Sequence, residues 1–259
     1  MRLFPFRSHH ESDRVSRVKH DPIMSTLPIE DALPALCCAL TEGRNALLTA
    51  APGAGKTTRV PLALLDAPWL GDKKLLMLEP RRLAARAAAH RMAVMLNQSV
   101  GETVGYRMRL DTKIGFKTRI EVVTEGTLSR LLQQDPALSD YAIVLFDEFH
   151  ERSLQADTGL TLCLEAQRLF RSDLRLLVMS ATLDCGPIAS LLGHAPVIIS
   201  EGKMFPVEIR YLDRPLSGHL DAAVVQSIRR SLVQDHGSLL VFLPGMVEIR
   251  RVERKLLDL

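Results

Sequence analysis

A glycine-rich stretch, Ala50-Ala51-Pro52-Gly53-Ala54-Gly55-Lys56-Thr57, contains the residue types that bind nucleotide phosphates. Glycines let backbone N–H groups turn inward at places where a side chain would block the phosphates. Lys56 would then reach the β- and γ-phosphates of ATP, and Thr57 would place its hydroxyl on Mg²⁺. We therefore predict a site for ATP and Mg²⁺ formed by Gly53, Ala54, Gly55, Lys56, Thr57 and Thr58.

The residues around this loop provide the strand, loop and helix context that a phosphate-binding loop needs. An apolar run at 46–49 indicates a buried strand before the loop, and residues 58–65 indicate a helix after it. The usual pattern begins with a glycine, and Ala50 stands in that place here. A glycine-rich turn that closes onto an ordinary helix is the alternative interpretation of the loop taken alone.

A second chemical signal is the apolar run 143–146, which ends in Asp147 and Glu148. Ligands of open α/β sheets bind at the carboxyl ends of the strands, so these carboxylates would lie near the phosphate loop. Asp147 would hold Mg²⁺, usually through water, and Glu148 would orient and deprotonate the attacking water. An apolar run that ends in Asp-Glu is common by itself. Combined with the phosphate loop, it predicts a composite nucleotide site.

Strand-like and helix-like patterns alternate along most of the chain. Apolar runs that indicate strands occur at 46–49, 74–79, 119–124, 141–146 and 174–180. Helical patterns occur between them, at 29–40, 58–65, 80–96, 126–134 and 153–170. This alternation predicts an α/β fold with a doubly wound parallel sheet that is covered by helices on both faces.

Both ends of the chain differ from this central part, so we predict three segments: 1–24, 25–213 and 214–259. Residues 1–24 are polar, lack the apolar centre of a signal peptide, and are predicted to be a disordered extension. Met24 precedes residues that can cap a helix. We therefore hypothesise that residues 1–23 are a dispensable extension from an upstream start codon. At the other end, residues 213–218 resemble a linker, followed by a helix at 219–234, a strand at 238–243 and a last helix.

Composition sets limits on function. The chain of 259 residues has a net charge of +3, and residues 1–24 hold five Arg/Lys against three Asp/Glu, so the remainder is close to neutral. Overall charge therefore does not indicate a nucleic-acid binder, and that function must rest on local sites. The four cysteines lack the spacing of a zinc or redox site. Free thiols without a signal peptide lead us to expect a cytoplasmic protein.

Several motifs resemble those of the DEAH-box helicases. Asp147-Glu148-Phe149-His150 is similar to their motif II, with phenylalanine in the usual alanine place, and Ser180-Ala181-Thr182 to motif III. Residues 79–85 resemble motif Ia and residues 124–128 resemble motif Ib. Further similar stretches are 101–107, 205–207, 240–245 and 248–249. The resemblance runs from about residue 25 to the end, points most closely to a bacterial member, and implies a RecA-like P-loop NTPase lobe.

The resemblance implies a nucleic-acid contact surface. Arg81 and Arg82 correspond to a basic pair that meets the nucleic-acid backbone. Thr124 and Gly126 correspond to backbone contacts made by a hydroxyl and a main-chain N–H. Phosphate contacts of this kind position a strand without reading its sequence. A solvated helix start is the alternative for the two arginines, although cations are mildly unfavourable at that end of a helix.

The resemblance also implies a nucleotide contact and a coupling role. Arg91 is similar to an arginine that stacks on the adenine, and a surface arginine on an amphipathic helix is the alternative. His150, Ser180 and Thr182 would link ATP hydrolysis to a second lobe. His150 has no partners at metal-ligand spacing, and a plain strand end is the alternative for the Ser-Ala-Thr motif.

The family completes its ATP site with an arginine from the second lobe, and nothing after Gly245 matches that late motif. We therefore expect the first lobe and only the beginning of a second RecA-like lobe, without duplex unwinding by this chain alone. The resemblance implies an ATP-dependent helicase that moves on single-stranded nucleic acid, with RNA implied by the family. A P-loop ATPase that acts as a nucleotide-dependent binding switch is the alternative, and no residue separates RNA from DNA.

Overall fold

The computed structural model describes residues 27–182, 185–202, 206–212 and 220–257. The predicted extension 1–24, the alternative start at Met24 and the linker 213–218 lie outside the described residues. Contacts divide the chain into two units, Met1–Met204 and Phe205–Leu259. Among the described residues we find no helix whose length and apolar character would let it cross a membrane.

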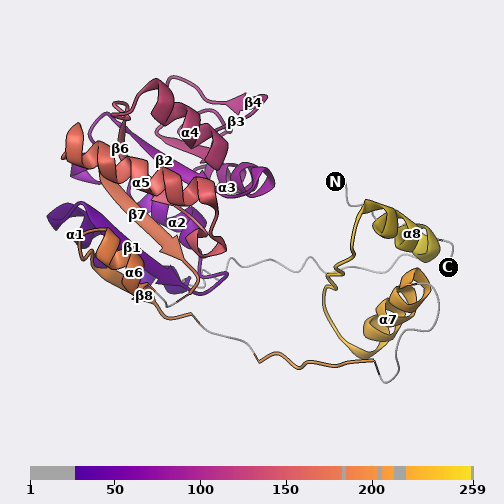
Figure 1. Ribbon diagram of the computed structural model, residues 1–259. Coiled ribbons are helices and arrows are strands. Elements are labelled where there is room, and N and C mark those ends of the chain that lie inside the picture. Colours follow the sequence, from indigo (N-terminus) through magenta and orange to yellow (C-terminus); the bar gives the residue numbers. More distant parts are fainter. Residues whose placement is uncertain (1–26, 183–184, 203–205, 213–219, 258–259) are drawn as a thin grey trace. The chain divides into compact units, whose positions relative to one another are not determined.

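The first unit is built on one eight-stranded sheet (Figure 1). Its strands follow the order β4-β3-β5-β2-β6-β7-β1-β8, and every neighbouring pair is parallel except β3 and β4. Parallel strands all point their carboxyl ends to one edge, where the predicted site residues follow them. The strands are β1 Asn45–Ala50, β2 Lys74–Glu79, β3 Val104–Met108, β4 Asp111–Lys113, β5 Ile120–Thr124, β6 Tyr141–Phe146, β7 Arg175–Ser180 and β8 Val197–Ser200.

Helices cover both faces of the sheet (Figure 1). Alternate residues of β2 enter two different cores, with Leu75 and Met77 in one and Leu76 and Leu78 in the other, because successive strand side chains point to opposite faces. The first core contains side chains of α1 Leu33–Glu42, α2 Lys56–Ala63 and α3 Arg82–Met95. The second contains side chains of α4 Glu125–Gln134 and α5 Leu154–Leu169, with α6 Gly186–Leu191 packed against it. Short 3₁₀ turns occur at η1 Pro28–Asp31, η2 Pro68–Leu70 and η3 Phe149–Glu151.

The predicted fold class is confirmed, with differences in detail. The predictions at 74–79 and 141–146 coincide with β2 and β6, and those at 46–49, 119–124 and 174–180 agree with β1, β5 and β7 within one residue at each end. The prediction missed β3, β4, α6 and β8. These elements are short, and the exposed residues of β4 and β8 remove the continuous apolar run that reveals a buried parallel strand.

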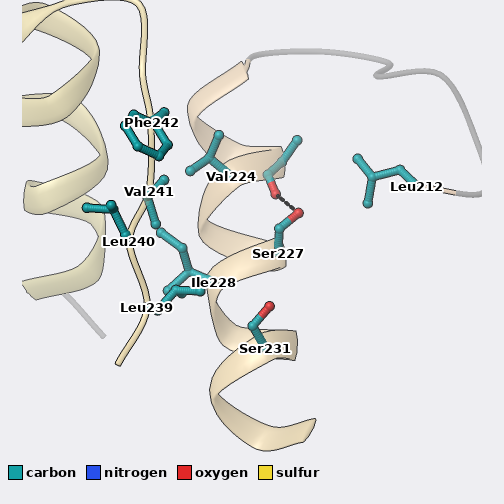
Figure 2. A pocket seen from close by; sticks show the side chains of 10 residues that line it. Leu212, Val224, Ser227, Ile228, Ser231, Leu239, Leu240, Val241 and Phe242 are labelled. Carbon is teal, nitrogen blue, oxygen red and sulfur yellow. Dashed lines mark hydrogen bonds between the residues drawn. The ribbon is translucent and has the colours of Figure 1, made fainter. Parts of the chain in front are cut away.

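The described residues of the second unit form two helices, α7 Leu220–Gln234 and α8 Met246–Leu257. Their contact is a small core of Val225, Ile228 and Val252. The strand predicted at 238–243 is wrong, because these residues belong to no strand of the structure. A strand needs a hydrogen-bonded neighbour, and none of the described strands pairs with this segment. Residues 239–242 instead run beside α7 and line an apolar cleft of ≈ 270 Å³ with it (Figure 2).

Candidate nucleotide-binding site

The phosphate loop connects the end of β1 to the start of α2. Gly53 and Gly55 have φ angles of 79° and 97°, in the left-handed region that glycine adopts without a steric penalty. Gly55 precedes the first residue of α2, Lys56, and supplies no side-chain cap to the helix. The N–H groups of Thr58 and Arg59 donate to the carbonyl oxygen of Gly55, which leaves those of Lys56 and Thr57 to receive an anion. The positive end of the helix dipole favours an anion there.

The turn η1 supports the loop from behind. The N–H of Ile29 donates to the carbonyl oxygen of Ala54 at 3.3 Å. A Cβ on Gly55 would lie 2.7 Å from Cδ1 of Leu27, so no larger residue fits at position 55 without movement. Arg59 of α2 also pairs with Glu30 at 2.9 Å. The residues just before the first helix therefore hold the loop in shape, a role that the sequence did not indicate.

The loop and the end of β6 meet through two side-chain pairs. Nζ of Lys56 lies 2.8 Å from Oε1 of Glu148, and the hydroxyl of Thr57 donates to Oδ2 of Asp147 at 2.6 Å. Lys56 and Asp147 are each only 4% exposed. Two residues of the loop thus contact the two predicted acidic residues, as a composite nucleotide site requires.

Burial shapes the electrostatics of these acids. Burial raises the pKa of Asp147, while the Thr57 hydrogen bond and the charge of Lys56 oppose the shift. The pKa of the neighbouring Glu79 is raised to about 9, chiefly because its carboxyl is buried. The charge of Asp147 and a hydrogen bond with Asp147 add to this rise. A divalent cation would relieve this crowding of carboxyl groups.

The residues present fit Mg²⁺ better than a metal held by protein ligands alone. The described part of the chain contains no group of three or more His, Cys, Asp or Glu side chains placed to hold a metal. Mg²⁺ is usually bound through one or two carboxylates together with substrate phosphates and water. Asp147 and the hydroxyl of Thr57 are oxygen donors of this kind, in contact with each other beside the phosphate loop.

A cleft of ≈ 450 Å³ lies beside these pairs. Thr57, Thr58 and Glu148 line it together with Arg91 on the exposed surface of α3. The cleft therefore brings the predicted adenine-stacking arginine into the same space as the phosphate loop. Its role in binding the base stays a prediction.

The predicted coupling residues are joined by hydrogen bonds. The N–H of Ala181, which follows β7, donates to Nδ1 of His150 at 3.2 Å. Nδ1 can accept this bond only when it carries no proton, so its 3.4 Å approach to Glu148 is not a second hydrogen bond. The hydroxyl of Ser180 lies 3.2 Å from that of Thr182. A hydrogen bond thus connects His150, two residues after Glu148, to the segment after β7.

The predicted nucleic-acid residues lie at the ends of two adjacent strands. Glu79 of β2 is opposite Thr124 of β5, so the segments that contain Arg81 and Gly126 begin side by side. Arg81 pairs with Glu151 at 2.9 Å, and Arg82 donates to the carbonyl oxygen of Arg109 at 3.1 Å. Both arginines and Gly126 are exposed. The four residues therefore border one surface, and their nucleic-acid contacts stay a prediction.

Two acidic residues at this edge of the sheet were not predicted. Glu79 lies buried beside Asp147, and Glu151 holds Arg81. A single acid at the end of an otherwise apolar strand was the signal for Glu79. Glu151 gave no comparable signal, because an exposed acid in a polar segment is ordinary.

Comparison with known proteins shows what this arrangement is similar to. The family model for the DEAD/DEAH box helicases matches residues 30–190. The ATP-dependent RNA helicase HrpB of Escherichia coli is 52% identical over 233 residues, which cover 90% of this chain and 29% of that protein. A putative pre-mRNA-splicing factor ATP-dependent RNA helicase of Schizosaccharomyces pombe is 33% identical, over 90% of this chain and 36% of its own length.

Solved structures give the same result. A crystal structure of the E. coli DEAH/RHA helicase HrpB matches with a TM-score of 0.83 and 52% identity, over 90% of this chain and 30% of the solved chain. A crystal structure of the E. coli DExH-box NTPase HrpB matches with a TM-score of 0.74, over 91% of this chain. The chain spans about a third of the length of these relatives.

Proposed function

This chain belongs to the DEAD/DEAH box helicase family, and we propose that it provides the ATP-binding lobe of an ATP-dependent RNA helicase. One observation carries the proposal. Lys56 and Thr57, at the start of α2, contact Glu148 and Asp147, at the end of β6. The same four residues were predicted from the sequence to bind the phosphates, hold Mg²⁺ and activate water.

The proposed reaction is hydrolysis of the terminal phosphate of ATP. Glu148 accepts a proton from a water molecule whose oxygen forms a bond to the γ-phosphorus. The bond between this phosphorus and the β–γ bridging oxygen breaks, which yields ADP and inorganic phosphate. Phosphate oxygens would compete with Glu148 for the ammonium of Lys56, which lies 2.8 Å from it. Release from Lys56 would free the Glu148 carboxylate to act as the base.

Thr57 and Asp147 are the residues that would hold the metal. When bound there, Mg²⁺ would supply positive charge that partly neutralises the phosphate oxygens of ATP. The backbone N–H of Glu148 donates to Oδ1 of Asp147 at 2.8 Å, and Thr57 donates to Oδ2. These two bonds fix the orientation of the Asp147 carboxyl before any ion binds, so little reorganisation is needed at the moment of binding.

The proposed nucleic acid is single-stranded RNA. Two relatives carry names that describe them as RNA helicases. Arg81, Arg82, Thr124 and Gly126 border one surface at the ends of β2 and β5, where they would contact the sugar–phosphate backbone. Contacts of this kind are independent of sequence, which suits a protein that moves along a strand.

Coupling between hydrolysis and movement is assigned to His150 and the segment after β7. The hydrogen bond from Ala181 to His150 ties the end of β7 to the residues that follow Glu148. A movement of Glu148 during hydrolysis would therefore shift His150 and, through it, the segment that contains Ser180 and Thr182. These two residues bond to each other. This connection supports the coupling role implied by the resemblance.

The experiment compares ATP turnover by the protein alone, with single-stranded RNA and with single-stranded DNA of the same sequence and length. The proposal predicts Mg²⁺-dependent ATP binding and stimulation of turnover by RNA. Absence of ATP binding would overturn it, and stimulation by DNA alone would assign a different substrate. If RNA affinity changes with the nucleotide while a protein spanning the whole length of the relatives separates no strands, the binding-switch alternative holds.

A further inference from the structure

Glu79 is a buried acid to which the steps above give no role. It is the last residue of β2, and only 2% of its surface is exposed. No donor among the described residues bonds to its Oε1 atom. A buried carboxyl without a donor lowers stability, because it loses its hydrogen bonds to water. An apolar side chain, such as the others buried in β2, would serve better if position 79 only filled space.

The position of Glu79 joins it to the proposed metal site. Its strand pairs with β6 up to the contact of Leu78 with Phe146, and the N–H of Asp147 then donates to the carbonyl oxygen of Leu78 at 3.0 Å. Glu79 and Asp147 therefore lie next to each other at the ends of two neighbouring strands. Glu79 also lines the cleft that contains Thr57 and Glu148. Its carboxyl thus faces the space in which the phosphates and Mg²⁺ would lie.

Acidic side chains outnumber the cation around this space. Glu79 and Glu148 line the cleft, Asp147 lies next to Glu79 across the strand pair, and Lys56 pairs with Glu148. Mg²⁺ prefers oxygen donors of this kind. A carboxyl that cannot reach such an ion directly can still accept a hydrogen bond from the water bound to it, as outer partners of metal ligands commonly do.

We propose that Glu79 is a positioning residue of the magnesium site, which holds the carboxyl of Asp147 in place and accepts a hydrogen bond from metal-bound water. The inference rests on the proposed function and deepens it. Glu79 acts through Asp147 and through water, so it is neither the base nor a direct ligand. Removal of outer partners of this kind typically lowers metal affinity about 10- to 100-fold.

The experiment titrates Mg²⁺ into the protein with a fluorescent ADP and separately measures the unfolding temperature of the metal-free protein. Glu79→Leu is expected to raise the Mg²⁺ midpoint about 10- to 100-fold while the metal-free protein unfolds at the same or a higher temperature. Glu79→Gln keeps the shape, an acceptor for water and a donor for Asp147, so its Mg²⁺ midpoint is expected to stay within about threefold of the original. Glu79→Ala replaces the leucine variant if that variant does not fold.

Glu121 provides the matched control. It is a fully buried acid on the adjacent strand β5, where the hydroxyl of Tyr141 donates to it at 3.0 Å and Arg107 pairs with it at 2.7 Å. Because Glu121 has partners and lies away from the cleft, Glu121→Gln is expected to lower the unfolding temperature and leave the Mg²⁺ midpoint unchanged.

Two outcomes would overturn the role of Glu79. One is an unchanged Mg²⁺ midpoint in Glu79→Leu. The other is a fall in unfolding temperature with an equal loss of ADP binding with and without Mg²⁺, which would show a structural role. Asp147→Asn separates this inference from the proposed function. If Asp147→Asn abolishes the Mg²⁺ dependence and Glu79→Leu does not, only the inference fails. If the unmodified protein shows no Mg²⁺ dependence, the proposed function fails as well.

Discussion

Lys56 Nζ lies 2.8 Å from Oε1 of Glu148, which joins the lysine of the phosphate loop to the proposed general base. Lys56 is almost fully buried, whereas the side chain of Glu148 is 29% exposed. The lysine therefore has Glu148 as its partner in this arrangement, and phosphate oxygens would replace that partner when ATP binds. ATP binding would then release Glu148 from Lys56, so that binding and activation of the base occur in the same step.

Replacement of the proposed base should separate hydrolysis from binding. Glu148→Gln keeps the shape of the side chain but cannot accept the proton from water. In a protein that spans the whole length of the relatives, we expect turnover to fall by about 10²-fold or more, in line with general-base contributions, while ATP still binds. Steady-state turnover and equilibrium ATP binding measure the two effects. Glu165→Gln, at an exposed ion pair on α5, is the control. A normal rate in Glu148→Gln would assign the base to another residue.

Alanine at Gly53 of the phosphate loop should weaken ATP binding, whereas alanine at Gly193, which has a similar backbone conformation, should not. Gly53 and Gly193 have φ angles of 79° and 77°, and a Cβ on either would meet nothing within 4 Å. Alanine at both positions should therefore carry a similar backbone penalty of about 1–2 kcal/mol. Only at Gly53 would the added methyl group enter the space of the phosphates. We expect similar unfolding temperatures for the two variants and weaker ATP binding in Gly53→Ala alone. Equal ATP affinity in the two variants would show that the phosphates do not bind at Gly53.

The two arginines after β2 should determine nucleic-acid affinity without sequence preference. Replacing Arg81 and Arg82 with alanine should weaken single-strand RNA binding. It should also reduce the slope of log affinity against log salt concentration by about one to two. Binding measured over a range of salt concentrations gives that slope. Arg168→Ala, which removes a comparable exposed ion pair on α5, should leave it unchanged. If the double variant keeps the original slope, these arginines are merely solvated.

The stability of the metal-free protein should depend on pH through Glu79. Its pKa is raised from 4.5 to about 9, chiefly by burial. The folded state thus favours the protonated form, and the stability from this group is present below pH 4.5 and lost as pH rises through 9. The unfolding temperature of the unmodified protein should fall relative to Glu79→Gln between these values, because the amide does not titrate. Parallel curves for the two proteins would contradict this.

Much of the fold could be predicted because long buried strands appear in the sequence as continuous apolar runs. The run Tyr141–Phe146 is buried at all six positions, and its predicted bounds were correct. The short strands β4 and β8 have exposed positions and were missed. The strand predicted at 238–243 failed for another reason. Its residues have the right composition, but strand formation depends on a neighbour, which local sequence does not reveal.

The candidate site was predictable in part for related reasons. Lys56, Thr57, Asp147 and Glu148 follow strand ends, and a parallel sheet places all such ends at one edge. The support of the loop by Leu27 and Ile29 was not predictable, because it depends on packing between segments about 25 residues apart. The burial of Glu79 beside Asp147 likewise depends on which strands become neighbours, and β2 and β6 lie far apart in the sequence.

Equilibrium ATP binding by Lys56→Ala tests the central claim most directly. Charge-assisted hydrogen bonds of this kind contribute roughly 1.5–3 kcal/mol, so the variant should bind ATP about tenfold or more weakly. Lys73→Ala is the control, because Lys73 pairs with Asp173 at the exposed surface and should leave ATP affinity unchanged. An ATP affinity in Lys56→Ala equal to that of the unmodified protein would contradict the assignment of the phosphate-binding loop.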